Sequence, residues 1–407
     1  MGSFAFLREN ARWLSAGMLL TFLSSFGQTF FISIFAGEIR TEFNLSHGEW
    51  GGIYTLGTGL SAVIMVWAGG LTDRFRVRAL GTVILLMLFL ACLFMAFNRA
   101  VWLLPLVILA LRFTGQGMTS HIAVVAMSRW FIATRGKALS IATLGFALGE
   151  ALLPLIFVAL MLVFDWRLLW GLAGLIAVLG VPGLVFLLRQ ERTPQSLASS
   201  DQALGMQGHH WTRNQAFRHW LFWFMAPAIL GPSAFNTAFF FHQVHFAEVK
   251  SMTHVELVAM FPFYTLVSIG TMILSGWALD RLGTARLIPY FQLPMVAAFV
   301  IFAYADGSGA MLLGFFFLGL TTGANTTLPA AFWAEFYGTR HIGAIKALAA
   351  AFMVLGSAIG PGLTGLAIDL GMGIETQYLF IAVYFVFASA MVFMGIAKAR
   401  PLLAVTP

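Results

Sequence analysis

The sequence predicts an all-α membrane protein with twelve transmembrane helices in two pseudo-symmetric halves of six helices each. Its 407 residues are 60% hydrophobic and only 10% charged, whereas a soluble domain carries about 25% charged residues. The apolar residues gather into twelve runs of suitable length, since a spanning helix needs about 20 residues. Motifs in the first half of the chain also recur in the second half.

Charged and turn-forming residues separate the apolar runs. The longest polar interval, 189–218, is rich in Ser, Gln, Asp and Pro and is typical of a linker. We therefore predict a first bundle at 1–188, a cytoplasmic linker at 189–218 and a second bundle at 219–407. The predicted spans are 12–36, 50–72, 79–97, 101–127, 138–163, 168–188, 219–243, 255–279, 287–304, 309–333, 343–368 and 377–397.

The basic residues set the orientation of the chain. With the N-terminus in the cytoplasm, 18 of the 23 Lys and Arg residues fall inside and four outside, with Arg112 left within a span. The positive-inside rule then predicts cytoplasmic termini in a multi-pass protein of the cell inner (plasma) membrane. This topology accounts for the net charge of +7. We therefore expect the lipid bilayer, and no nucleic acid, as a partner.

A loop motif occurs twice, as GGLTDRFRVR at 69–78 and GWALDRLGTAR at 276–286. A repeat of this length indicates two duplicated six-helix halves, an arrangement found in many secondary transporters. At a constant offset of 207 residues, the matched pairs are Gly69 and Gly276, Asp73 and Asp280, Arg74 and Arg281, and also Gly149 and Gly356.

The duplicated loop resembles the signature loop of the major facilitator superfamily, and the resemblance covers the whole chain. RFTGQG at 112–117 is similar to the second motif of that family, with Gln116 where glycine is usual. GFALGEALLP at 145–154 is similar to the gate motif of its antiporters, with Glu150 in place of proline. The resemblance implies a transporter whose first, fourth, seventh and tenth spans line a central cavity.

We expect the two loops to act as a conformational latch. Asp73 lies where the third helix begins, so its carboxylate can favour the positive helix end and pair with a nearby arginine. Such a pair can hold one conformation and release in another. The alternative is an anionic cap beside arginines that only set the topology. The predicted latch residues are Gly69, Asp73, Arg74, Gly276, Asp280 and Arg281.

Two charged residues lie deep in predicted spans. Arg112 follows Arg99 by 13 residues and Glu150 precedes Asp165 by 15, which places both about 20 Å from the same membrane face. Their helices are adjacent and antiparallel, so we expect an ion pair that lowers the cost of burying each charge. This pair is either a fixed structural link or a functional one, in which Arg112 binds an anion and Glu150 carries a proton.

Polar residues in the cavity-lining spans are further candidates, with interhelical hydrogen bonding as the alternative role. Gln116 and Thr119 follow Arg112 on one α-helical face. His242 lies near the outer end of the seventh span, where imidazole can titrate, or can simply be wetted. The predicted substrate-binding or coupling residues are Arg112, Gln116, Gln28, Thr29, Asn236, Thr237 and Asn325, and the predicted proton-coupling residues are Glu150 and His242.

These features indicate a gradient-driven secondary transporter. One deep cation among polar residues suits a small organic anion such as a monocarboxylate. SHGEWGGIYTLGTGLSA at 46–62 resembles the monocarboxylate and oxalate–formate branches, although 255–277 lacks their basic residue in the eighth span. The alternatives are a drug–proton antiporter, with Arg112 and Glu150 handling the proton, and a non-transporting membrane receptor.

The sequence contains no Walker loop, zinc-ligand spacing or nucleophile elbow. We therefore expect no enzymatic activity, no cofactor and no metal, and a gradient as the energy source. The expected partners are a small-molecule substrate and protons, and the expected assembly is a monomer.

Overall fold

The chain is helical wherever it is described. The computed structural model describes residues 3–131, 134–190 and 204–403, and these ranges contain helices and no strand. Among the described residues, ten helices are long and apolar enough to cross a membrane, and an eleventh span results if the bent pair Phe6–Gly27 and Thr29–Phe43 is one span. The all-helical membrane fold is confirmed, whereas the predicted count of twelve spans is not.

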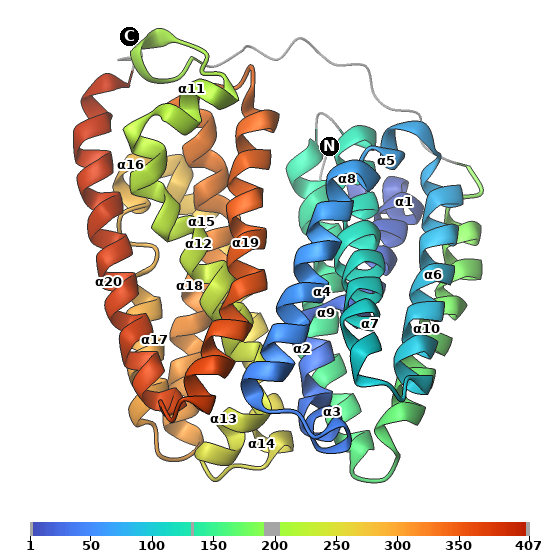
Figure 1. Cartoon of the computed structure of the whole chain (residues 1–407). Coiled ribbons are helices and arrows are strands. Elements are labelled where there is room, and N and C mark those ends of the chain that lie inside the picture. Colours follow the sequence, from blue (N-terminus) through green and yellow to red (C-terminus); the bar gives the residue numbers. More distant parts are fainter. Residues whose placement is uncertain (1–2, 132–133, 191–203, 404–407) are drawn as a thin grey trace. The chain divides into compact units, whose positions relative to one another are not determined.

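Two compact units make up the described chain, and each is a bundle of helices (Figure 1). Unit 1 contains the described residues up to 190 together with Phe240–His245, and unit 2 contains 204–239 and 246–403. Up to residue 190 the helices are α1 (Ser3–Leu23), η1 (Ser24–Gly27), α2 (Thr29–Ile32), η2 (Ser33–Phe35), α3 (Ala36–Phe43), α4 (His47–Ala68), α5 (Leu71–Arg74), α6 (Val77–Phe97), η3 (Val101–Leu103), α7 (Leu104–Leu111), η4 (Arg112–Thr119), α8 (Ser120–Trp130), α9 (Arg135–Met161) and α10 (Trp166–Leu187). From residue 204 they are η6 (Met206–Gly208), α11 (Arg213–Arg218), α12 (Trp220–Phe241), α13 (Gln243–Val249), α14 (His254–Val258), α15 (Phe261–Leu282), α16 (Thr284–Leu287), α17 (Leu293–Tyr304), α18 (Ser308–Tyr337), α19 (Ile342–Asp369), α20 (Ile374–Ala399) and η7 (Arg400–Leu402).

The first and ninth predicted spans differ from single straight helices. In the first, Gln28 is extended (φ −86°, ψ 154°) and separates η1 from α2, and the helices on either side are bent by 47°. In the ninth, α17 begins only at Leu293 and has 12 residues. Pro294 lies in its first turn, and a proline ring would clash with the carbonyl four residues earlier if the helix began at 287.

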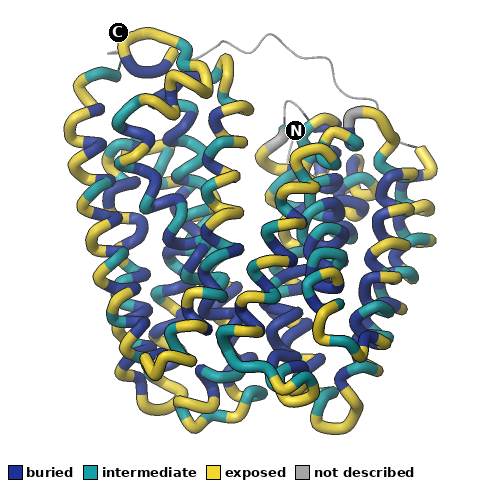
Figure 2. The backbone as a smooth tube through the Cα atoms, in the orientation of Figure 1, coloured by how far each residue is buried: buried dark blue, intermediate teal, exposed yellow. Residues whose placement is uncertain are grey.

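Equivalent helices pack together in the two units. In unit 1, α6 packs on α10 and α4 on α7; in unit 2, α17 packs on α20 and α15 on α18. Buried residues follow the inner faces of these helices, while exposed residues follow their outer faces (Figure 2). Many exposed side chains are large and apolar, such as Val66 and Trp67, which are 76% and 73% exposed. Such faces are typical of contact with lipid.

Small residues allow close helix crossings at matched places. A Cβ atom on Gly149 of α9 would lie 2.0 Å from Ser25 Oγ. A Cβ atom on Gly356 of α19 would lie 2.8 Å from the Leu230 carbonyl oxygen and 3.3 Å from Ser233 Cβ. Membrane helices approach closely where such small residues meet. The predicted correspondence of Gly149 and Gly356 therefore extends to their contacts.

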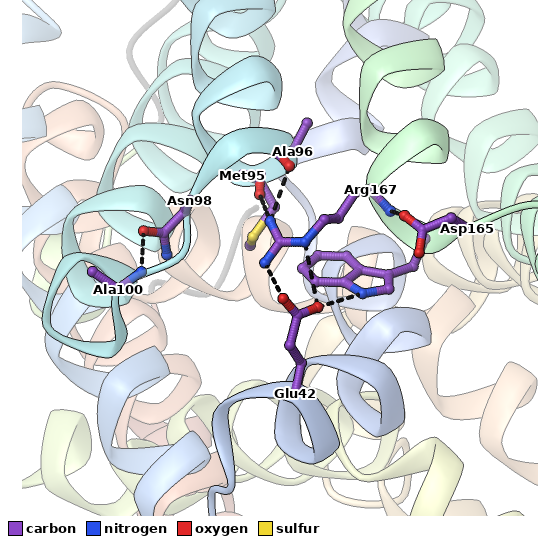
Figure 3. A network of polar contacts seen from close by, with 8 residues as sticks. Glu42, Met95, Ala96, Asn98, Ala100, Asp165 and Arg167 are labelled. Carbon is purple, nitrogen blue, oxygen red and sulfur yellow. Dashed lines mark hydrogen bonds and ion pairs between the residues drawn. The ribbon is translucent and has the colours of Figure 1, made fainter.

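A polar network, which we call clamp 1, joins three helices at one end of unit 1 (Figure 3). Arg167, at the start of α10, pairs with Glu42 of α3 through Nη2 and Oε1 at 2.5 Å. Its Nη1 donates to the Ala96 carbonyl oxygen, at the end of α6, at 2.9 Å. Trp166 Nε1 donates to Glu42 Oε2 at 3.0 Å. Clamp 1 therefore fixes the first, third and sixth spans to one another.

Unit 2 contains a corresponding network, clamp 2. Lys250, which follows α13, donates through Nζ to the Ala303 carbonyl oxygen near the end of α17 at 2.9 Å. The same ammonium group pairs with Glu375 in the first turn of α20. Clamp 2 therefore joins the seventh, ninth and twelfth predicted spans.

Part of the predicted linker packs on unit 2. Met206 and Ala216 are fully buried in a cluster with residues of α12, α18 and α19. Trp211 donates its backbone N–H to the Tyr337 carbonyl oxygen at 3.0 Å. A Cβ atom on Gly205 would lie 2.5 Å from the Tyr337 carbonyl carbon, so glycine allows this close approach. Residues 204–218 thus form a cap on the end of α18, and the boundary at 219 stays a prediction.

Candidate functional site

Arg112 opens a π-helix, η4, between α7 and α8. π-helical segments are rare and occur frequently at functional sites. Thr119, predicted to share a face with Arg112, instead donates its hydroxyl to the Thr114 carbonyl oxygen, five residues earlier, at 2.6 Å. The α-helical register used for that prediction does not apply, because a π-helix has more residues in each turn.

Two glycines bring the first span against η4. A Cβ atom on Gly115 would lie 2.6 Å from the Cα and N atoms of Gly27, and one on Gly27 would lie 2.2 Å from the Leu111 carbonyl oxygen. Both approaches involve backbone atoms, so a side chain at either position would force the helices apart. The first glycine of the RFTGQG motif, Gly115, therefore has a structural function, since it lets η1 cross beside Arg112.

The Arg112 side chain is 2% exposed and has two hydrogen-bond acceptors on the first span. Its Nη1 donates to the Gly27 carbonyl oxygen at 3.2 Å and to Thr29 Oγ1 at 3.3 Å. The predicted ion pair with Glu150 is wrong, because these oxygen atoms, brought near by the Gly27–Gly115 crossing, are the partners of Arg112. Neutral oxygen acceptors thus meet part of the cost of burying the charge.

The other edge of the guanidinium has no such partners. Arg112 Nε is buried without a hydrogen bond, and no described residue accepts a hydrogen bond from Nη2. A planar guanidinium presents its N–H groups in a fixed fork that matches the two oxygens of a carboxylate. The protein therefore holds one side of the fork, the Nε–Nη2 edge has no partner among the described residues, and its use in binding an anion stays a prediction.

Tyr54 of α4 completes this site, although no sequence pattern indicated it. Its ring centroid lies 5.4 Å from Arg112 Cζ, within the range of a cation–π interaction. Its hydroxyl is hydrogen-bonded to Thr29 Oγ1, and the side chain is fully buried. We call Arg112, Thr29, Tyr54 and the Gly27 carbonyl group the arginine junction.

Gln28 and Gln116 flank the arginine junction. Gln28 supplies the extended residue that precedes Thr29, and its side chain is 9% exposed. Gln116 is half-buried, and its backbone N would lie 2.8 Å from a Cβ atom on Gly27. The structure therefore places both residues beside the site through backbone contacts, and their binding role stays a prediction.

Glu150 lies apart from the arginine junction on α9. Its neighbour Gly149 packs against Ser25 of η1, and Phe146, one turn earlier, packs edge-on against Phe30 at 5.6 Å. Glu150 is half-buried, and the described residues give its carboxylate no hydrogen bond or ion pair. The predicted proton-coupling role of Glu150 stays a prediction.

Unit 2 has a neutral junction at the matching place. Asn236 of α12 donates to Thr322 Oγ1 of α18 at 3.4 Å, and Tyr264 of α15 donates to the same oxygen at 3.2 Å. Thr237 follows Asn236 on α12, and Asn325 lies three residues after Thr322 on α18. Both are half-buried, and neither forms a hydrogen bond with a described side chain. Three substrate-binding residues were predicted in this unit. Among them, only Asn236 forms a side-chain hydrogen bond to a described residue of another helix.

His242 lies between α12 and α13 and is 3% exposed. Within unit 1 its ring centroid is 5.0 Å from Phe241 and 6.0 Å from His47 of α4. The ring centroid of Phe241 in turn lies 4.6 Å from that of Tyr54. His242 is therefore buried against aromatic rings rather than wetted, and its proton-coupling role stays a prediction.

The two loop motifs have different surroundings. A Cβ atom on Gly69 would lie 3.4 Å from His121 Nε2, whereas no atom of a described neighbouring residue lies within 4 Å of a Cβ atom on Gly276. Arg129, at the end of α8, donates to the Thr72 carbonyl oxygen at 2.7 Å and so fixes the first loop. In the second, Arg281 lies over the Trp277 ring at 4.2 Å.

The predicted latch residues lie on these loops and the adjoining helix ends. Arg74, Asp280 and Arg281 are exposed. The Asp73 side chain lies outside the described residues. The latch therefore stays a prediction in both copies.

Comparison with known proteins identifies the family. A family model for the Major Facilitator Superfamily matches residues 17–361. No curated protein sequence matches the chain.

Solved structures of transporters share the fold. A bacterial homologue of the human lysosomal transporter Spinster, in an inward-facing and unoccupied conformation, has a TM-score of 0.73 at 16% identity, covering 98% of this chain and 99% of that one. The nucleoside transporter NupG has a TM-score of 0.71 at 14% identity, covering 95% of this chain and 99% of that one. The chain belongs to the major facilitator superfamily, and its fold is that of the transporters of this family.

Proposed function

We propose that the chain is a secondary transporter that moves a small organic anion, such as a monocarboxylate, across the cell inner membrane by alternating access. The observation that carries this proposal is the arginine junction. Arg112 is fully buried and held through Nη1, while its Nε–Nη2 edge has no partner among the described residues. Interactions of this kind between a guanidinium and a carboxylate are strong and direction-specific.

Proton coupling is the second part of the proposal. Glu150 lies in a membrane-spanning helix without a cation beside it among the described residues. Protonation would remove its charge during the steps in which the substrate crosses, because a buried carboxylate is costly when ionised. Arg112 and Glu150 thus have separate functions, Arg112 in binding the anion and Glu150 in carrying the proton, without an ion pair between them.

The alternatives predict different substrates. A drug–proton antiporter would use Glu150 in the same way, but its apolar or cationic substrates give no function to the arginine fork. A non-transporting receptor on the same fold would bind an anion without moving it. The structural neighbour NupG is a nucleoside transporter. Nucleosides carry no carboxylate that could match the Nε–Nη2 edge.

Transport in proteoliposomes tests the proposal. Purified protein is reconstituted, and uptake of labelled lactate, labelled uridine and a lipophilic cationic dye is measured with and without a pH gradient. We expect lactate to accumulate with the gradient and the other two to equilibrate at the rate of empty vesicles. Gradient-driven movement of the dye or of uridine instead of lactate would contradict the anion assignment, and specific binding without uptake would indicate a receptor.

A further inference from the structure

Tyr54 lies against the guanidinium of Arg112, and it is the residue of the arginine junction that sequence patterns did not indicate. We propose that Tyr54 is a positioning residue that directs the Nε–Nη2 edge of Arg112 towards the transported anion and so determines the affinity for carboxylates. This inference rests on the proposed function, because it concerns how Arg112 is presented to its substrate.

Close packing of α4 fixes the place of the Tyr54 ring. A Cβ atom on Gly57, one turn after Tyr54, would lie 2.7 Å from the Pro105 carbonyl oxygen and 2.8 Å from Ile108 Cβ. The absence of that Cβ atom lets α4 pack tightly on α7, the helix that leads into η4. Tyr54 is fully buried at this contact, with its ring centroid 5.4 Å from Arg112 Cζ.

The Tyr54 hydroxyl fixes the partner of Arg112. Thr29 Oγ1 accepts from Arg112 Nη1 at 3.3 Å and is also hydrogen-bonded to the Tyr54 hydroxyl. A threonine hydroxyl has one proton and two lone pairs, so these two bonds use most of its capacity and fix its direction. Tyr54 therefore acts on the guanidinium from two sides, through its ring and through Thr29.

The two contacts restrict rotation of the guanidinium plane. The Gly27 carbonyl oxygen and Thr29 Oγ1 hold Nη1, and the Tyr54 ring covers the guanidinium. With these partners fixed, the remaining edge can only point one way. A fork that is already oriented loses less entropy when it binds a carboxylate, so its affinity is higher.

Removing the hydroxyl alone tests this inference. In Tyr54→Phe the ring stays but the bond to Thr29 is lost. We expect the KM for labelled lactate in counterflow to rise about three- to tenfold, as for loss of one buried hydrogen bond, while the maximal rate changes less than twofold. A matched control is Tyr384→Phe, which loses a hydroxyl bonded to the Pro227 carbonyl oxygen at 2.8 Å, outside the arginine junction. The KM of this control should stay within twofold of the wild-type value.

The same substitution in an Arg112→Lys variant distinguishes a positioning role of Tyr54 from an effect on the stability of the protein. Arg112→Lys keeps a positive charge but has no planar fork to orient. Adding Tyr54→Phe to Arg112→Lys should therefore raise the KM less than twofold further. The thermal unfolding midpoints of Tyr54→Phe and Tyr384→Phe should fall by similar amounts, because each loses one hydrogen bond.

The outcomes distinguish this inference from the proposed function. If wild-type protein transports lactate and Tyr54→Phe has an unchanged KM, or if its effect is equally large in the Arg112→Lys background, the positioning role is wrong and the proposed function stands. If the wild-type protein neither binds nor transports lactate, the proposed function fails and this inference fails with it. A KM that rises only when Arg112 is intact supports the assignment.

Discussion

Clamp 1 and clamp 2 join equivalent helices of their units with opposite polarity. In unit 1 the cation is on the last span and the anion on the first, whereas in unit 2 the cation is on the first span and the anion on the last. The paired positions, 207 or 208 residues apart, are Glu42 and Lys250, Arg167 and Glu375, and Ala96 and Ala303. In both units the cation donates to a carbonyl at the C-terminal end of the third span.

The reversed polarity shows that the common feature of the two clamps is a cation at the C-terminal end of the third span. Unpaired carbonyl groups make a helix C-terminus negative, so a cation there is favourable whichever neighbouring helix carries it. The anion then pairs with the cation from the remaining helix. We infer that the clamps are scaffold, since their polarity is interchangeable between the units.

The two central junctions differ in kind and not only in polarity. The 207-residue offset relates Arg112 to Gly319, but by contacts its counterpart is Thr322. Thr322 joins Asn236 and Tyr264 as Arg112 joins Thr29 and Tyr54. A buried cation in one unit and a hydroxyl in the other cannot do the same chemistry, so substitutions in the two junctions should have unequal effects on transport.

The largest expected effect is that of Arg112→Gln. Glutamine can keep a hydrogen bond to the first span, but it has neither the charge nor the fork that binds a carboxylate. We expect lactate uptake to fall at least 100-fold, with the protein still folded. Thr322→Val, which changes the neutral junction, should lower uptake less than tenfold. Equal losses in the two variants would show that the junctions are functionally equivalent.

Glu150→Gln should uncouple transport from protons. The second unit has Ser357 at the corresponding place, beside Gly356. Because glutamine is permanently neutral, the variant should keep lactate–lactate exchange within about threefold of wild type but lose pH-driven accumulation. Ser357→Ala is the matched control and should accumulate lactate normally. Accumulation that persists in Glu150→Gln would assign this carboxylate to structure.

Gly115→Ala tests the crossing that makes the arginine junction possible. The added Cβ atom would meet Gly27 backbone atoms at 2.6 Å, so we expect a loss of stability of about 2–3 kcal/mol, as for other overpacked sites. In the described part of the chain, no neighbouring atom lies within 4 Å of a Cβ atom on Gly171 in α10, and Gly171→Ala should be neutral or slightly stabilising. Thermal unfolding in detergent measures both. A neutral Gly115→Ala would mean that the first span can move without cost.

Depth along the spans could be predicted from the sequence, but orientation around them could not. Counting residues from the loops predicted that Arg112 and Glu150 lie deep, and both lie well inside helices that are long and apolar enough to cross a membrane. Their pairing was predicted from equal depth on adjacent antiparallel helices, whereas the direction of the Arg112 side chain depends on the turn of its own helix, the π-helix η4. Arg112 also meets the first span through the Gly27–Gly115 contact, which joins residues 88 positions apart and which no local pattern encodes.

Tyr54 was missed for a related reason. A single tyrosine in the apolar stretch WGGIYTLGTG carries no charge or spacing signal. The glycines beside it permit a close approach of helices, but they do not specify which helix approaches. The duplicated motifs were more informative, because the Gly149–Gly356 correspondence extends to matched contacts with Ser25 and Ser233.

Exchanging the polarity of clamp 1 should have the smallest effect, and it tests the comparison most directly. Arg167→Ala removes a partly exposed ion pair and a donor to the Ala96 carbonyl oxygen, so we expect a loss of about 1–2 kcal/mol. The double variant Glu42→Lys/Arg167→Glu copies the polarity of clamp 2. It should recover most of that loss, because a lysine introduced at position 42 would reach the end of α6 as Lys250 reaches the end of α17. If the exchanged pair is no more stable than Arg167→Ala, the cation must come from the last span of unit 1, and the polarity of the clamps is not interchangeable.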